Sequence, residues 1–65
     1  MKRASQRDVM RRLYREHRGN EEGTVRAYAE AEQRGEVLRI SNTHRLDAET
    51  YARALFEDGQ RKGWL

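Results

Sequence analysis

The chain has 65 residues, of which 35% are hydrophobic and 38% are charged, and its net charge is +3. This length supports one domain, near the lower limit for a chain that folds around a single core. The absence of Cys excludes a disulfide framework and a thiolate zinc site. No apolar run approaches the roughly 18 residues of a membrane span, and the N-terminus lacks an apolar signal, so we expect a cytoplasmic protein without membrane contact.

The first predicted helix covers about residues 5–18. Ser5 is placed to cap it, and Asp8 lies three residues later, where a capping box has its acid. Apolar residues then recur at helical spacing from Val9 onward, which predicts one face packed on the core. Gly19 is a residue type that commonly ends a helix.

Basic residues gather in this first helix. Residues 1–18 carry seven basic and two acidic side chains, a net charge of +5, so the rest of the chain sums to −2. Four arginines lie within roughly 80° of the helix surface, each about one turn from the next. This arginine stripe consists of Arg7, Arg11, Arg15 and Arg18.

Like charges at this spacing repel each other, so helix stability does not explain the stripe. Arginine presents a planar fork that suits phosphates and carboxylates, and the stripe therefore predicts a polyanion-binding surface. One alternative is that the stripe serves solubility alone. The other is that the arginine side chains lie over the small core, or pair within the chain with the acids near the second helix: Glu21, Glu22, Glu30 and Glu32.

The second predicted helix covers about residues 24–34. Thr24 can cap its start, and Gly35 follows its end. Val25 and Tyr28 belong to its inner face, together with small alanines that let a neighbouring helix approach closely.

Residues 36–45, EVLRISNTHR, are expected to form a short extended segment or a buried turn between the second and third helices. Its clustered aliphatics predict a partly buried stretch, and its polar residues predict a turn. These polar side chains include the groups that bind base edges and phosphates, although an ordinary turn is the alternative. The candidates are Arg39, Asn42, Thr43, His44 and Arg45.

The third predicted helix begins after Asp47, a favourable N-cap, and ends at Gly59. The sequence from Leu46 onward, LDAETYARALFEDGQRKGWL, resembles the recognition helix and wing entry of winged helix-turn-helix proteins. The matching features are a capped helix with an apolar inner face, a basic turn, Gly63 and an apolar pair. The resemblance covers about the last twenty residues and implies a three-helix DNA-binding fold.

Two features distinguish the third predicted helix from a DNA-recognition helix. Its outward residues are Glu49, Thr50, Arg53 and Glu57, an acidic set for a groove lined by phosphates. About twelve residues separate it from the second helix, where a helix-turn-helix has three or four. We therefore expect it to be scaffold, and we expect Trp64 and Leu65 to fold back on the core or to lie in an interface.

The residue inventory argues against an enzyme. His17 and His44 are the only histidines, and they lie in separate predicted elements without a triad context. No Gly-rich phosphate loop, zinc-ligand spacing or EF-hand pattern occurs. We expect no catalytic residues, no metal and no cofactor.

The sequence thus predicts an all-α fold, a compact three-helix domain over residues 1–65 with a short extended segment between the second and third helices. The predicted core consists of Leu13, Tyr14, Val25, Tyr28, Leu38, Ile40, Leu46, Tyr51, Leu55 and Phe56.

The predicted function is that of a small non-enzymatic regulator of bacterial or phage origin that contacts the backbone of double-stranded DNA through the arginine stripe. Its small core and apolar tail suggest a homodimer. The alternative is a protein-binding module, such as a phage inhibitor or antitoxin-like partner, whose basic helix docks on an acidic protein surface.

Overall fold

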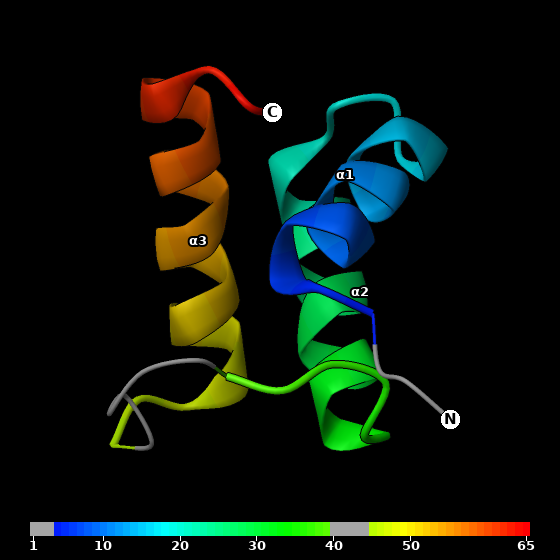
Figure 1. Ribbon diagram of the computed structural model, residues 1–65, viewed down its shortest axis with the longest axis vertical. Coiled ribbons are helices and arrows are strands. Elements are labelled where there is room, and N and C mark those ends of the chain that lie inside the picture. Colours follow the sequence, from blue (N-terminus) through cyan, green and yellow to red (C-terminus); the bar gives the residue numbers. More distant parts are fainter. Residues whose placement is uncertain (1–3, 40–44) are drawn as a thin grey trace.

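The computed structural model describes residues 4–39 and 45–65, and all regular structure within them is helical. The helices are α1 (Gln6–Glu16), α2 (Glu21–Gln33) and α3 (Ala48–Lys62). α2 packs against both other helices: α1 crosses it, and α3 stands beside it (Figure 1). The predicted all-α, three-helix fold is confirmed. None of the described helices is long and apolar enough to cross a membrane.

Each helix begins at a side-chain cap. Ser5, Asn20 and Asp47 each accept a hydrogen bond from the backbone N–H three residues later, at 3.1, 2.7 and 3.2 Å. The caps at Ser5 and Asp47 are confirmed, whereas the predicted cap at Thr24 is wrong. Because Asn20 supplies the cap, α2 starts at Glu21, and the Thr24 hydroxyl donates to the Asn20 carbonyl at 2.7 Å from inside the helix.

Two helix ends also differ from the prediction. α1 ends at Glu16, because Arg18 and Gly19 adopt left-handed backbone conformations with φ of 54° and 80°. α3 continues through Gly59 to Lys62, and its left-handed terminating residue is Gly63, with φ of 86°. A glycine can thus stay inside a helix when another residue supplies the stop.

The core lies between the three helices. Its buried residues are Val9, Met10, Leu13, Val25, Tyr28, Ala31, Val37, Tyr51, Ala52 and Phe56. Tyr14 and Leu55 pack against this core and are half-buried, as is the tail that ends in Trp64 and Leu65. Most of the predicted core is therefore confirmed.

For two residues, the prediction that they belong to the core is wrong. Leu38 is 57% exposed and Leu46 is 39% exposed. Val37, which is 1% exposed, fills the core position in this segment, and its neighbour Leu38 is left outside. Ile40 lies outside the described residues.

The C-terminal tail folds back over α3. The N–H groups of Gly63 and Leu65 both donate to the Gly59 carbonyl, at 2.9 and 3.2 Å. A Cβ at Gly59 would lie 2.8 Å from Leu65 Cγ and 3.0 Å from the Trp64 ring, so the tail sits directly on this glycine. The predicted return of the tail to the core is confirmed, and Figure 1 shows it as the red segment that reaches from α3 toward α1.

Candidate nucleic-acid interface

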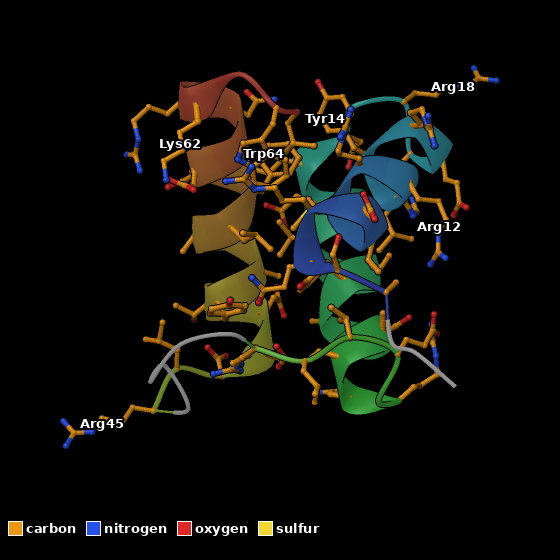
Figure 2. All side chains as sticks on the ribbon, viewed as in Figure 1. Arg12, Tyr14, Arg18, Arg45, Lys62 and Trp64 are labelled. Carbon is orange, nitrogen blue, oxygen red and sulfur yellow. The ribbon has the colours of Figure 1, made fainter. Side chains whose placement is uncertain are left out.

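The arginine stripe runs along α1 and into the turn that follows. Arg7, Arg11 and Arg15 belong to the helix, and all are exposed. Arg18 is also exposed, but it lies beyond the end of the helix in a left-handed conformation. Figure 2 shows its side chain directed away from the molecule. The stripe is therefore three helical arginines continued by one on a turn.

Among the described residues, no carboxylate lies within 4.0 Å of any stripe guanidinium. Three of the four acids of α2 pair with other cations, and Glu30 is exposed without an ion pair among the described residues. Glu21 and Glu22 pair with Arg53 of α3, at 3.2 and 2.9 Å. Glu32 pairs with Arg39 at 2.9 Å. The pairing of the stripe with α2 that the sequence leaves open is thus not observed in the described part of the chain.

Most other cations are neutralised by nearby acids. Arg12 lies 3.7 Å from both Glu16 and Glu36, and Arg34 also pairs with Glu36. At the end of α3, Arg61 and Lys62 pair with Asp58, at 3.0 and 3.3 Å. Outside the stripe, only Arg26 and Arg45 of the described cations lack such a partner. Uncompensated positive charge is therefore concentrated on α1 and its turn.

These pairs change the acidity of their carboxyl groups. The hydrogen bond from Arg53 lowers the pKa of Glu22, and Arg34 lowers the pKa of Glu36 in the same way. The pKa of Asp58 is lowered by the hydrogen bond from Arg61 and by Lys62. Each of these carboxylates is stabilised in its charged form by its partner cation, so the pair persists to lower pH than it would at the ordinary pKa.

Aromatic side chains border the stripe. The Arg7 guanidinium lies over the Trp64 ring, 5.2 Å from its centroid, in a cation–π arrangement. Trp64 also lines two open hollows. The larger, of about 470 Å³, includes Arg7, Tyr51 and Asp58 in its lining. The smaller, of about 240 Å³, is lined by Arg11, Tyr14, Arg15, Trp64 and Leu65.

The sequence predicts that the tail returns to the core, but not that it lies beside the stripe. The signal that could have linked them is Gly63, whose left-handed conformation turns the chain back so that Trp64 reaches α1. Figure 2 shows Trp64 between α3 and α1, close to Tyr14. The candidate surface is therefore the arginine stripe together with Tyr14 and Trp64.

The candidate residues of the segment at 39–45 are not brought into this surface. Arg39 donates two hydrogen bonds to Glu32, at 2.9 and 3.0 Å, and one to the Leu46 carbonyl at 2.8 Å. Its guanidinium also lies over the Tyr51 ring, 4.7 Å from the centroid. Arg39 thus ties this segment to α2 and α3.

Arg45 is exposed, and Figure 2 shows it at the opposite corner of the molecule from Arg18. Asn42, Thr43 and His44 lie outside the described residues. The stripe and Arg45 therefore face different surroundings. Among the described residues, no group of three His, Cys, Asp or Glu side chains could hold a metal ion.

No family model matches this chain, and no curated protein or solved structure matches it either. What the protein binds is therefore inferred from its own surface.

Proposed function

We propose that this protein is a small non-enzymatic DNA-binding protein that contacts the phosphate backbone of double-stranded DNA through the arginine stripe. The observation that carries the proposal is that the stripe arginines are exposed and have no acidic partner among the described residues, while most other cations are paired. Unpaired guanidinium groups are available to phosphates without first breaking an internal ion pair. In this proposal the protein is a cytoplasmic regulator of bacterial or phage origin, and a homodimer doubles its phosphate contacts.

The stripe has a geometry that suits a polyanion. From Arg7 to Arg15, eight residues of helix extend about 12 Å at 1.5 Å per residue, and Arg18 continues the line beyond the helix end. Several phosphates can therefore be contacted at once by side chains that need no backbone rearrangement. Contacts of this kind position a protein on DNA and carry no sequence information of their own.

Salt dependence of binding tests this proposal. Neutralising phosphates releases counterions, so the slope of log K against log salt flattens by about 0.9 unit for each phosphate that the protein no longer neutralises. For the double variant Arg11→Ala/Arg15→Ala, we expect the slope on a labelled duplex to flatten by roughly two units. Fluorescence anisotropy between about 50 and 300 mM NaCl measures it.

The matched control is the double variant Arg34→Ala/Arg61→Ala, which removes the same charge from two exposed ion pairs. Its slope should stay close to that of the unmodified protein, because those guanidinium groups already have carboxylate partners. Equal flattening in the two variants would mean that net charge alone drives binding, and would contradict a role for the stripe. No binding to any duplex at about 50 mM NaCl would remove the proposal altogether.

The second candidate is a protein-binding module that docks on an acidic protein surface. Its supporting observation is the half-buried aromatic and aliphatic border of the stripe, at Tyr14, Trp64 and Leu65. Aromatic residues and Arg are enriched where proteins bind proteins. Polyglutamate that binds more tightly than DNA of equal charge, with binding abolished by Arg11→Glu/Arg15→Glu, would favour this candidate over DNA.

A further inference from the structure

Two hollows flank Trp64, and they differ in charge. The larger contains Asp58, whose carboxylate is paired with Arg61 and Lys62. The smaller contains two guanidinium groups, those of Arg11 and Arg15, and no acidic side chain in its lining. Neither arginine has a carboxylate partner among the described residues. The smaller hollow is thus the one that suits a ligand with negative groups.

The aromatic walls of the smaller hollow are held in place. Tyr14 packs against Phe56, with ring centroids 5.7 Å apart, and its hydroxyl accepts a hydrogen bond from the Gln60 amide at 3.4 Å. Trp64 rests on Gly59 and lies beneath the Arg7 guanidinium. Rings fixed in this way need little ordering when a ligand enters.

The volume of the hollow limits what can enter it. At about 240 Å³ it is below the roughly 300–1,000 Å³ of pockets that enclose drug-sized ligands. It therefore suits one flat ring whose attached groups stay outside, beside the two arginines. Nucleic acids present this combination where a base is unpaired, with phosphates on either side of it.

We infer that the hollow between Tyr14 and Trp64 receives one unpaired nucleobase, with the flanking phosphates held by Arg11 and Arg15. This inference rests on the proposed DNA binding and narrows its target to duplexes that carry an unpaired base, such as a bulge or a frayed end. Base stacking on aromatic side chains tolerates any base, so the hollow recognises the absence of pairing and not a particular sequence.

The test compares an intact duplex with the same duplex carrying one bulged base. Stacking on an aromatic side chain is expected to favour the bulged duplex on the order of 5- to 100-fold in Kd. The chain has a single Trp, so its fluorescence reports on the surroundings of Trp64. We expect the bulged duplex to quench Trp64 emission and the intact duplex to leave it nearly unchanged.

Two substitutions separate stacking from backbone contact. Trp64→Leu keeps an apolar tail but removes the aromatic face, and should abolish the preference for the bulge. Trp64→Phe keeps a ring and should retain part of the preference. Circular dichroism of both variants checks that the helices are intact.

Several results would overturn the inference, and they differ from those that overturn DNA binding. Equal Kd values for intact and bulged duplexes, with a normal salt slope, would contradict base stacking and leave the proposed function standing. A preference that persists in Trp64→Leu would place the unpaired base elsewhere. Quenching by an aromatic acidic peptide, without quenching by the bulged duplex, would assign the hollow to a protein partner.

Discussion

At the scale of single residues, Arg39 and Arg11 are one residue type in two different surroundings. Arg39 is held by Glu32, by the Leu46 carbonyl and by the Tyr51 ring, and its side chain is only 17% exposed. Arg11 is exposed and has no carboxylate partner among the described residues. The first arrangement stabilises the fold, and the second leaves a guanidinium available to a ligand.

Replacing Arg39 by Ala should destabilise the protein. The change leaves Glu32 half-buried without its partner and frees the segment that Arg39 ties to α2. Because both side chains keep some solvent contact, the effect should be smaller than for a fully buried pair, at about 1–3 kcal/mol in the free energy of unfolding. Urea denaturation followed by circular dichroism measures it.

The control for this change is Arg34→Ala. Arg34 belongs to an exposed pair with Glu36, and such pairs contribute little. Its unfolding midpoint should stay close to that of the unmodified protein. If both variants are destabilised equally, the contacts of Arg39 stabilise the fold no more than an exposed ion pair does.

Sequence reasoning assigns both arginines to candidate binding sites because their chemistry is identical. What separates them is the path of the chain after α2. The left-handed turn at Gly35 brings Arg39 back over Glu32, seven positions earlier. Helical periodicity contains no information about the path of the chain after α2, so the pairing of Arg39 with Glu32 could not be predicted.

At the scale of elements, α3 and the tail depend on each other. Helix starts were predictable at Ser5 and Asp47, because a short polar side chain next to an apolar periodic run has a local cause. The end of α3 was not predictable, since Gly59 and Gly63 are both glycines and either could adopt the left-handed conformation that ends a helix. Which of them stops the helix depends on where Trp64 and Leu65 find contacts.

Replacing Gly59 by Ala should displace the tail. The new methyl group would meet Leu65 Cγ at 2.8 Å and the Trp64 ring at 3.0 Å, so these side chains must shift outward. An exposed Gly→Ala change inside a helix ordinarily gains about 1 kcal/mol, and we expect that gain to be cancelled here by poorer packing of the tail. Trp64 emission should move to longer wavelength and become more accessible to acrylamide.

The control on the same helix is Glu57→Ala, at an exposed position of α3. Its Trp64 emission should match that of the unmodified protein. An unchanged spectrum in Gly59→Ala, together with a full helical gain in stability, would show that the tail is not packed on this glycine.

At the scale of the whole molecule, paired and unpaired charged side chains lie on different parts of the surface. Most ion pairs lie on α2, α3 and the segment after α2, whereas four of the unpaired arginines lie on α1 and its turn. The sequence predicts the imbalance, because it is a matter of counting along the chain. Which acids pair with which cations could not be predicted, since Arg53 lies more than thirty positions from Glu21 and Glu22.

This arrangement predicts an acid-sensitive fold. The pKa values of Glu22, Glu36, Asp47 and Asp58 are all lowered in the folded protein, chiefly by hydrogen bonds from Arg53, Arg34, Thr50 and Arg61 in turn. The unfolded chain therefore binds protons more readily than the folded one. Stability should be fully present at neutral pH and be lost as the pH falls below the ordinary values of 4.5 for Glu and 3.8 for Asp.

Thermal unfolding at pH 7 and pH 3, in low salt, measures this effect as a lower Tm in acid. The variant Glu22→Gln should show a smaller decrease in Tm between pH 7 and pH 3, because it has no carboxylate at position 22 to be protonated. Glu57→Gln, at an exposed acid without an ion pair among the described residues, should behave like the unmodified protein. A Tm that is the same at both pH values would contradict the linkage.

Arg18, in the turn after α1, holds a left-handed backbone conformation with φ of 54°, which an L-residue other than Asn or Asp adopts at a cost of about 1 kcal/mol. Glycine at position 18 would relieve that strain but would remove the outermost cation of the stripe. Random variants selected for heat resistance and variants selected for retention on an anionic resin should therefore diverge at this position, the first toward glycine and the second toward arginine.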